Sequence, residues 1–425
     1  MLCNIEIFLD NKWQLAGYFE PDDTVNKTGY RSAGHFNYDV QYVAQQLQTG
    51  ISAALSCNFP TSFELWNTAS WPAFLLDILP SGAGRRHWLN QLNINDGASA
   101  DWQLLLQGAS NPVGNLRIQQ SVQTDTNTQH QGFDYKEVIT RRDDFIEYAF
   151  QHGAPVSGSS GAQGDAPKFL LTQDKQGKWH ADGALADEYC SKHWLVKFPK
   201  SNRDLDLSVL RNEAAYYEVA RECGLYTGEA IKLDNNALFI PRFDRQITAN
   251  NQVIRLGIES LSSLAGITEF GAATSKNTYC KAIAKHCTNP TDNLIEFVKR
   301  DILDIALGNT DNHGRNTAIQ RLSNNDVKLT PLYDFAPMIL DPQGIARLSR
   351  WENEESQGRP EWGKVLQFIS TLGCDMQKAK QALQQLHIKI SQLPKIMKKH
   401  AVDNDLITQL QPRLENVANE LGKLK

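Results

Sequence analysis

The fold of this chain is decided by the stretch Gly308-Asn309-Thr310-Asp311-Asn312-His313-Gly314-Arg315-Asn316. It contains an aspartate, Asp311, followed five residues later by an asparagine, Asn316. A second aspartate, Asp334, comes later in the segment Leu329-Thr-Pro-Leu-Tyr-Asp334-Phe335. A short polar motif of this kind is, by itself, more often an ordinary turn after a helix. Its meaning therefore depends on the partners that the rest of the chain supplies.

The residue types in this stretch suit phosphoryl transfer. An Asp-x-x-x-x-Asn loop followed by an Asp-Phe pair is the layout of a kinase catalytic loop and its metal-binding aspartate. A carboxylate such as Asp311 can orient and deprotonate a substrate hydroxyl group. The amide oxygen of Asn316 and the carboxylate of Asp334 can hold Mg²⁺ on ATP, because Mg²⁺ prefers hard oxygen ligands. The motif thus predicts ATP and Mg²⁺ as cofactors.

Composition narrows the class of protein. The chain has 425 residues, which predicts two or three domains, and its 41% hydrophobic and 21% charged residues are typical of a globular protein. A net charge of −5 argues against direct nucleic-acid binding. The 7 cysteines include no C-x-x-C pair, so we expect free thiols in a reducing compartment. With no signal peptide and no long apolar run, the predicted location is the cytoplasm, away from membranes.

The periodicity of apolar residues predicts an α+β chain in three parts. Alternation in residues 1–20 predicts a β-hairpin, and helical spacing follows in 39–57. The polar run 120–134 is interpreted as a linker. We therefore place an N-terminal β-rich subdomain at 1–135, a kinase N-lobe at 136–245, and a mostly helical C-lobe at 246–425.

A Ser/Gly-rich run precedes a predicted strand at 169–172. Small residues allow several backbone N–H groups to turn toward one anion, as phosphate-binding loops require. The run lacks the Gly-Lys-Ser/Thr ending of a Walker A loop, and the alternative is a flexible linker. Its candidate phosphate-binding residues are Ser157, Ser159, Ser160, Gly161, Ala162 and Gln163.

Lys197 lies inside the apolar strand His193-Trp-Leu-Val-Lys197-Phe-Pro199. A lysine there needs a partner for its ammonium group, and a kinase uses such a lysine on the α- and β-phosphates of ATP. The alternative is an edge-strand lysine that faces solvent. The helix that follows carries Glu213, a candidate ion-pair partner for Lys197. Asn212 is an equal candidate for a polar contact, and a solvated Glu213 is also open.

Two further segments are predicted to position the residues of the catalytic and nucleotide-binding site. Residues 230–240 predict two strands with an Asn-rich turn, ending in Arg242-Phe243-Asp244-Arg245 as a hinge between lobes. An amphipathic helix with Leu294, Val298, Ile302 and Ile305 begins at Pro290 and ends at Gly308. A predicted hairpin at 317–329 would then hold Asp334 opposite Asn316.

In this order, the motifs resemble those of the HipA family of bacterial serine/threonine kinases, the toxin half of HipBA-type toxin–antitoxin modules. The resemblance covers most of the chain. It is carried by Gly161-Ala-Gln163 with Pro167-Lys168, His193 to Pro199, Asn212-Glu213, Arg242-Phe-Asp-Arg245, Thr310 to Asn316, and Leu329 to Asp334, with weaker matches at Phe74–Pro80 and Val113-Gly114.

This resemblance implies a bilobal protein-kinase-like fold that uses ATP and Mg²⁺. Asp311 would be the catalytic base, and Asn316 and Asp334 the metal ligands. The nucleotide site would also include the Ser/Gly loop, Lys197, His313 and the hinge residues Arg242, Phe243 and Asp244. The family autophosphorylates a serine of the Ser/Gly loop, which leaves Ser157, Ser159 and Ser160 as candidates. Family substrates include aminoacyl-tRNA synthetases, and the usual partner is a small helix-turn-helix antitoxin.

The sequence departs from the family pattern at two places, and two other functions are also considered. Gly164-Asp165-Ala166 resembles an insertion that changes the phosphate loop, and Pro241 cannot donate a backbone N–H at the hinge. A phosphatidylinositol-kinase-like lipid kinase shares the Asp-x-His-x-x-Asn pattern, but the chain shows no basic amphipathic surface for membranes. A catalytically silent ATP-binding regulatory module would not need Lys197, Asp311, Asn316 and Asp334 together.

Overall fold

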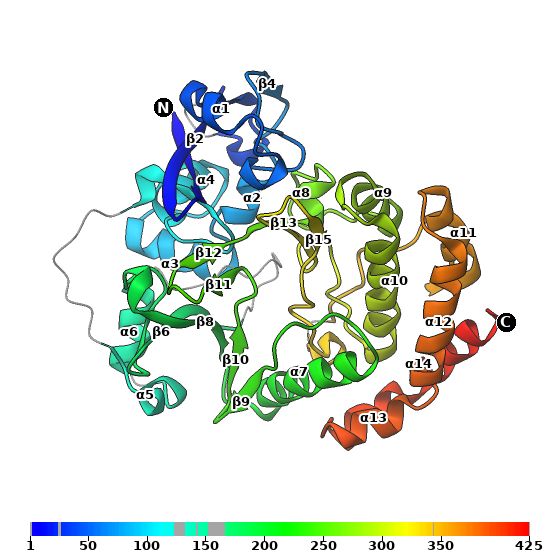
Figure 1. The fold of residues 1–425 in the computed structure, drawn as a ribbon. Helices are drawn as coiled ribbons and strands as arrows, with labels where there is room; N and C mark the ends of the chain where they lie inside the picture. Colours follow the sequence, from blue (N-terminus) through cyan, green and yellow to red (C-terminus); the bar gives the residue numbers. More distant parts are fainter. Residues whose placement is uncertain are drawn as a thin grey trace. The chain divides into compact units, whose positions relative to one another are not determined.

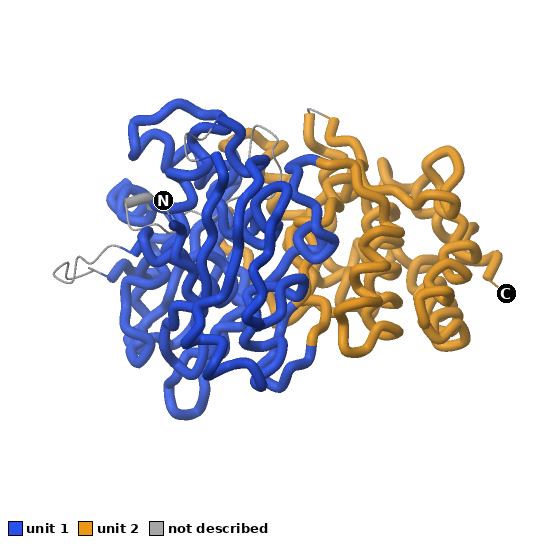
Figure 2. The backbone as a smooth tube through the Cα atoms, turned by 90° about the horizontal axis from the view of Figure 1, so that it is seen from above, with its two compact units in different colours: residues 1–200, 237–271, 320–326 blue, residues 201–236, 272–319, 327–425 orange. Residues whose placement is uncertain are grey.

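The computed structural model describes residues 2–23, 27–122, 132–141, 143–151, 166–342 and 344–424. The chain divides into two compact units, each built from separate stretches of sequence (Figure 2). Unit 1 consists of Met1–Lys200, Ala237–Gly271 and Gln320–Asp326. Unit 2 consists of Ser201–Asn236, Ala272–Ile319 and Val327–Lys425. Most of the strands belong to unit 1, and most of the long helices belong to unit 2 (Figure 1).

A five-stranded antiparallel sheet lies at the start of unit 1, with the strand order β4-β3-β2-β1-β5. The hairpin predicted in residues 1–20 is confirmed, because β1 pairs with β2 throughout. At its turn, Asp10 and Asn11 have φ values of 52° and 60°, the left-handed values that suit a two-residue hairpin. The strands are β1 (Cys3–Leu9), β2 (Lys12–Pro21), β3 (Gly34–Tyr38), β4 (Leu65–Thr68) and β5 (Leu116–Ile118).

Helices and aromatic side chains share a hydrophobic core with this sheet. Phe19 makes edge-to-face contacts with Trp71 at 5.8 Å and with Trp102 at 6.3 Å. Such large buried rings carry much of the hydrophobic stabilisation of a core. The helix predicted within 39–57 is shorter than expected, because the chain turns at Gly50 with φ 94°. The helices are α1 (Val40–Gln46), α2 (Leu75–Ile78), α3 (Gly82–Leu92) and α4 (Asp101–Gly108).

A second antiparallel group of strands in unit 1 has the order β7-β6-β8-β10. Two helices of the same unit contribute to its core, and Phe145 of α6 packs edge-to-face on Phe169 of β6 at 6.4 Å. Phe133, which we expected in a linker, is buried in this core and pairs with Trp179. The elements are α5 (Tyr135–Ile139), α6 (Asp143–Gln151), β6 (Lys168–Asp174), β7 (Trp179–Ala181), β8 (Cys190–Lys197) and β10 (Ala237–Pro241).

The last stretch of unit 1 completes its interior. Arg321 is fully buried, and its guanidinium lies 2.9 Å from the carboxylate of Glu259. The Asn325 side chain accepts a hydrogen bond from Ser52 N–H at 2.9 Å and donates one to Thr49 O at 2.8 Å. Unit 1 also contains β11 (Arg245–Ile247), β12 (Val253–Arg255), β13 (Gly257–Ser260) and α8 (Leu261–Leu264), while β14 (Ala318–Arg321) begins in unit 2 and ends in unit 1.

Unit 2 contains the predicted helix before the catalytic motif. Asn289 caps α10 by accepting from Asp292 N–H, and Pro290 occupies its first turn. Leu294, Val298 and Ile302 are fully buried, as their spacing predicts. The helices are α7 (Asp204–Glu222), α9 (Lys276–His286), α10 (Pro290–Leu307), α11 (Trp362–Thr371), α12 (Met376–Ile390), α13 (Leu393–Lys399) and α14 (Asn404–Gly422).

Short strands complete the fold. The predicted hairpin at 317–329 is confirmed, because Thr330 N–H donates to Ala318 O and Leu322 N–H donates to Asp326 O. The predicted Asn-rich turn has left-handed φ values at Asn235 and Asn236. The strands are β9 (Lys232–Asp234), β15 (Val327–Leu329), β16 (Glu355–Ser356) and β17 (Arg359–Pro360).

Two global expectations concern cysteines and membranes. All seven cysteines are buried free thiols, as predicted. Among the described residues, none of the helices has the length and apolarity to cross a membrane.

Candidate active site

The loop after α10 is fixed to the end of that helix. Gly308 ends α10 with φ 68°, a left-handed conformation that favours glycine. The backbone N–H of Asn309 donates to Asp304 O at 2.9 Å, and its side-chain amide donates to Asp304 Oδ1 at 2.8 Å. Ile339 N–H donates to Gly308 O at 2.9 Å. Because these bonds satisfy groups at the helix end, they set the direction in which the loop leaves α10.

Within the loop, Asp311 and Asn316 are connected through short-range hydrogen bonds. The side-chain amide of Asn316 donates to the backbone oxygen of Asp311 at 2.7 Å and lies 3.4 Å from its Oδ2 atom. Asn316 N–H donates to His313 O at 2.9 Å, and Arg315 N–H donates to His313 Nδ1 at 3.2 Å. The shortest of these bonds, from the Asn316 amide, therefore ends on the backbone of Asp311.

A buried charged network supports the loop. Lys276 Nζ lies 3.2 Å from Asp301 Oδ1 and donates to Asn312 O at 3.1 Å. The Asn312 side chain donates to Asp301 Oδ1 at 3.0 Å, and Trp351 Nε1 donates to Asp301 Oδ2 at 2.7 Å. A buried ion pair holds its neighbours firmly when each member is also hydrogen-bonded. The network therefore fixes the backbone directly after Asp311.

A second contact brings the Asp334 segment beside this loop. The Tyr333 hydroxyl donates to Arg315 O at 2.8 Å, which joins the residues that precede Asp334 and Asn316. Asp334 itself has φ 52°, an uncommon left-handed backbone for a residue other than glycine. Strained backbone of this kind is frequent at functional sites. The structure thus brings Asp311, Asn316 and Asp334 into one region of unit 2.

Two side chains in or near the loop, His313 and Asp304, have pKa values that differ from their ordinary values. Burial lowers the pKa of His313 to about 4, although the carboxylate of Asp334 acts in the opposite direction. The imidazole is therefore neutral at pH 7, and its Nε2 atom lies 3.4 Å from Asp311 Oδ1 without bringing a positive charge. Burial also raises the pKa of Asp304 to about 7, and the charge of Asp301 adds to this rise although Lys276 opposes it.

Lys197 lies at the end of β8 in unit 1. This strand pairs with β6 on one side and with β10 on the other, where Lys168 and Leu238 lie opposite Lys197. Lys197 is buried, with 7% of its surface exposed. The alternative of a solvent-facing lysine on an edge strand is therefore wrong.

The predicted hinge residues Arg242 and Asp244 belong to a buried ion network in unit 1. The Arg242 guanidinium donates to Asp244 at 2.9 and 2.6 Å and also binds Asp182. Asp244 Oδ2 accepts from Gly114 N–H at 2.8 Å and from Arg245 at 2.7 Å. Burial opposes ionisation of the carboxyl groups, but the arginines outweigh it and hold the pKa of Asp182 and Asp244 below the usual range. Phe243 lies between these two side chains in sequence, and its nucleotide contact stays a prediction.

The candidate residues of the Ser/Gly loop have no structural description. Ser157, Ser159, Ser160, Gly161, Ala162 and Gln163 lie outside the described residues, as does most of the proposed insertion at 164–166. The segment that follows is described, and Phe198 N–H donates to Pro167 O at 2.9 Å at the start of β6.

Comparison with known domain families decides the class of the protein. The HipA-like C-terminal domain matches residues 159–393, and the HipA N-terminal domain matches residues 14–119. The first match covers more than half of the chain. The chain belongs to the HipA family. It is therefore a HipA-family protein kinase, and a kinase of this family implies ATP as the phosphoryl donor.

One solved structure has the same fold over nearly the whole chain. HipA of Shewanella oneidensis MR-1, solved with HipB and operator DNA, matches with a TM-score of 0.64 at 16% identity, covering 99% of this chain and 97% of that chain. The Helicobacter pylori proinflammatory kinase CtkA matches with a TM-score of 0.34 at 16% identity, covering 55% of this chain and 92% of that chain. No curated protein sequence matches. The predicted α+β, kinase-like fold class is confirmed.

The residues that support this HipA-family site were only partly visible in the sequence. Asp301, Asp304 and Lys276 received no role, since a charged residue on an amphipathic helix is usually solvated. Their burial here puts two carboxylates on one face of α10, three residues apart. Glu213 is also fully buried, and its pairing with Lys197 stays a prediction.

We expect Gly314→Ala to damage the HipA catalytic loop strongly. A methyl group at this position would lie 2.4 Å from the ring and hydroxyl of Tyr279, which is buried in α9. Displacement of the loop by about 1 Å should reduce kcat by roughly 100-fold. Steady-state kinase assays would measure this loss. As a control, Gly363→Ala places its methyl group 3.7 Å from Leu424, an ordinary contact, and should retain activity. Wild-type kcat in Gly314→Ala would show that the Tyr279 ring does not constrain the loop.

We expect Asp304→Asn to remove part of the pH dependence of stability. The folded chain holds a proton on Asp304 up to about pH 7, whereas an aspartate ordinarily has a pKa of 3.8. Proton binding by Asp304 therefore stabilises the folded chain. This stabilisation is fully present below the pKa that Asp304 has in the unfolded chain, and it is lost as the pH rises through the pKa that Asp304 has in the folded chain. Between pH 5 and 7, the unfolding free energy of the wild type should therefore fall relative to the variant, by up to about 1.4 kcal/mol per pH unit.

Urea titrations at several pH values would measure this difference. Asp292→Asn, on the exposed surface of the same helix, should keep the wild-type pH profile. Parallel profiles for the wild type and Asp304→Asn would contradict the assignment.

Proposed function

We propose that this chain is a serine/threonine protein kinase that transfers the γ-phosphoryl group of ATP to a hydroxyl group of a cytosolic protein. The observation that carries the proposal is the hydrogen bond from Tyr333 to Arg315 O, which holds the Asp334 segment beside the Asp311–Asn316 loop. Family membership gives the reaction class. The contact between Tyr333 and Arg315 supports the proposed arrangement of the site.

Asp311 is the proposed catalytic base. Its carboxylate is half-buried in a loop whose backbone is fixed by Asn316 and by the Asp301 network. A base held in this way can accept the proton of a substrate hydroxyl while orienting its oxygen toward the phosphoryl group. The neutral His313 beside it adds no positive charge that would weaken the base. Because the backbone of the loop is already fixed, little entropy should be lost in orienting the carboxylate when substrate binds.

Asn316 and Asp334 are the proposed ligands of Mg²⁺. Their amide and carboxylate oxygens are the donor types that Mg²⁺ takes, and two protein ligands with phosphate oxygens form a usual Mg²⁺ site. In the part of the chain that the structure describes, no cluster of three or more His, Cys, Asp or Glu side chains could hold a metal alone. This agrees with an ion that is bound together with the nucleotide. When bound, Mg²⁺ would neutralise charge on the phosphates.

The other proposed nucleotide-binding residues belong to unit 1. Lys197 is proposed to bind the α- and β-phosphates, the role that a strand lysine has in protein kinases. The Ser/Gly loop is proposed to cover the phosphates and to carry the autophosphorylated serine, with Ser157, Ser159 and Ser160 as candidates. Segment 241–244 is proposed as the adenine-side hinge.

The proposed partners follow from the family. We infer a cytosolic protein substrate, with an aminoacyl-tRNA synthetase as the leading candidate, and growth inhibition as the result. The similar Shewanella protein was solved with HipB and operator DNA, which supports a small helix-turn-helix antitoxin as a partner of this chain. Any DNA contact would then be made mainly by the antitoxin, in agreement with the net charge of −5.

The proposal is tested by phosphoproteomics after expression of the wild type and of Asp311→Asn. Serine or threonine sites on one or a few cytosolic proteins, and on residues 157–160 of the chain, should be phosphorylated only with the wild type. The same pair of proteins would be assayed on phosphatidylinositol vesicles to test the lipid-kinase alternative. Phosphorylated lipid without protein phosphorylation would overturn the proposal, as would protein phosphorylation that is equal in both samples.

A further inference from the structure

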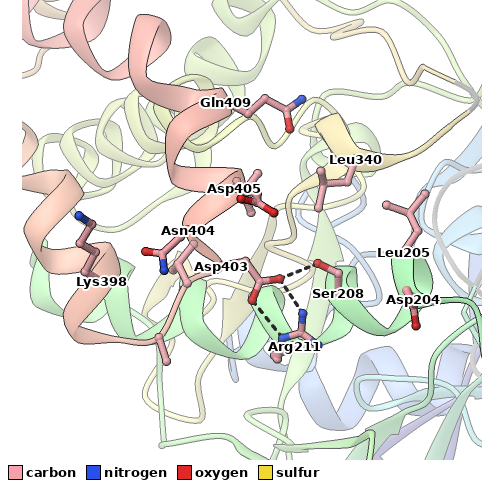
Figure 3. Close-up of a pocket in the computed structure, with 13 residues that line it drawn as sticks. Asp204, Leu205, Ser208, Arg211, Leu340, Lys398, Asp403, Asn404, Asp405 and Gln409 are labelled. Carbon is pink, nitrogen blue, oxygen red and sulfur yellow. Dashed lines mark hydrogen bonds and ion pairs between the residues drawn. The ribbon is translucent and has the colours of Figure 1, made fainter.

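A cavity of about 880 Å³ in unit 2 lies beside the first turns of α7 (Figure 3). Its wall is formed by residues 204–211 of α7, by Leu340, and by the segment from Lys398 to Gln409 that leads from α13 into α14. Figure 3 shows Asp403 at the boundary of this cavity, joined to Ser208 and Arg211. Asp403 lies far from the catalytic loop in sequence, so any effect that it has on the loop must pass through the residues that it contacts.

Asp403 connects α14 to α7. Its carboxylate accepts hydrogen bonds from Ser208 Oγ at 2.8 Å, from Arg211 at 3.1 and 2.6 Å, and from the Asn212 amide at 2.8 Å. Its backbone N–H donates to Asn212 Oδ1 at 2.9 Å. Asp403 is the N-cap residue of α14, yet its side chain makes no cap hydrogen bond. The carboxylate is therefore committed to α7 and not to its own helix.

The next turns of α7 contact the segment that carries Asp334. The Tyr216 ring lies 5.7 Å from the Phe335 ring, and its hydroxyl donates to Leu307 O at 2.8 Å. Tyr217 is also fully buried, and burial, followed by the charges of Glu213 and Asp334, raises the pKa of its hydroxyl group. Asn212 and Tyr216 are four residues apart, which places them on one side of the helix.

We propose that Asp403 is a positioning residue for the metal-binding segment at Asp334. It fixes the position of α7 through Ser208, Arg211 and Asn212, and α7 in turn holds the segment that carries Asp334 through the contact of Tyr216 with Phe335. Because Asn212 is fully buried, a shift of α7 at this end cannot be absorbed by solvent-exposed side chains. The catalytic consequence rests on the proposed function, in which Asp334 is a ligand of Mg²⁺.

Kinetics test the catalytic part of this inference. In Asp403→Ala, the Mg²⁺ concentration for half-maximal activity should rise by about 10-fold, as is usual when a residue that orients a metal ligand is removed. At saturating Mg²⁺, kcat should stay close to the wild-type value, which a general loss of folded protein would not produce. Asp405→Ala removes an exposed carboxylate from the same cavity wall and should leave both values unchanged.

Hydrogen exchange tests the positional part without any activity. Backbone amides of peptides covering Asp334 and Phe335 should exchange faster in Asp403→Ala than in the wild type, whereas amides in α12 should not change. Should Asp403→Ala fail to fold, Arg211→Gln removes two of the hydrogen bonds from a half-exposed side chain and serves as the second variant.

The two readouts separate the possible failures. Faster exchange at Asp334 together with a higher Mg²⁺ requirement supports the inference. Unchanged exchange at Asp334 overturns it, whatever the kinetics show. If the wild type has no kinase activity, the proposed function fails, and the exchange data still decide whether Asp403 positions this segment.

Discussion

Replacing Asp311 with asparagine should reduce the rate of phosphoryl transfer by roughly 10²- to 10⁴-fold, the usual contribution of a general base. Asparagine has nearly the same shape but cannot accept the proton of the substrate hydroxyl. The hydrogen bond that fixes Asn316 uses the backbone oxygen of Asp311, so the loop should keep its conformation in the variant. ATP affinity should therefore change little.

Two measurements check this expectation. Transfer of radiolabelled phosphate from ATP reports the rate, and calorimetric titration with ATP and Mg²⁺ reports affinity. Asp10→Asn is a matched control, because Asp10 is exposed in a turn with φ 52°, where asparagine is well tolerated. If Asp311→Asn transfers phosphate at the wild-type rate, Asp311 is not the catalytic base. The loop would then contain no residue with that proposed role.

Replacing Arg242 with methionine should destabilise the chain by about 3–5 kcal/mol, the usual cost of leaving buried charges without their partner. Arg242 is 6% exposed, and it binds both Asp182 and Asp244, which are also buried. Methionine fills similar space but neutralises neither carboxylate. Thermal unfolding should occur at a temperature lower by roughly 3–6 °C. Arg31→Met, which breaks a pair with Glu269 in which both side chains are exposed, should change stability very little.

The pH dependence of this loss gives an independent check. Arg242 holds the pKa of Asp182 and Asp244 below the usual value of 3.8, so the stability they contribute is present above that value and is lost as the pH falls. In Arg242→Met, these carboxyl groups should bind protons more readily. The difference in unfolding free energy between the variant and the wild type should therefore shrink between pH 7 and pH 4. A difference that does not depend on pH would indicate that lost packing, and not charge, is responsible.

Local sequence signals predicted the elements that position the active site. Asn289 and Pro290 at the start of α10 and Gly308 at its end are recognisable without a structure, because capping depends on neighbouring residues. The same holds for the turn at Asp10 and Asn11. The Asp311–Asn316 motif also lies on one short loop. These features follow from chemistry within a few residues of each other.

Contacts between distant residues were not predictable in the same way. No role is predicted for Asp301 from the sequence, and Arg242 is predicted as a hinge residue and not as the centre of a buried ion network. Each of these two residues binds a partner from another part of the chain. Asp403 reaches Asn212 across 191 positions. A single sequence contains no signal for such pairing, because the free energy that selects it comes from burial in the folded state. The helix predicted within 39–57 is confirmed only for Val40–Gln46, and the positive φ at Gly50 prevents its continuation toward Ile51.

The route of the chain through unit 1 has a consequence for synthesis on the ribosome. Glu259 is buried against Arg321, and Asn325 bonds to Thr49 and Ser52, so the interior of the first-made unit needs residues made far later. At a translation rate of about 5–20 residues per second, Arg321 is synthesised several seconds after Glu259, so Glu259 lacks this partner during that time. The nascent chain therefore cannot reach its final state until most of the polypeptide has been made. Kinase activity would consequently arise only near completion of each new molecule.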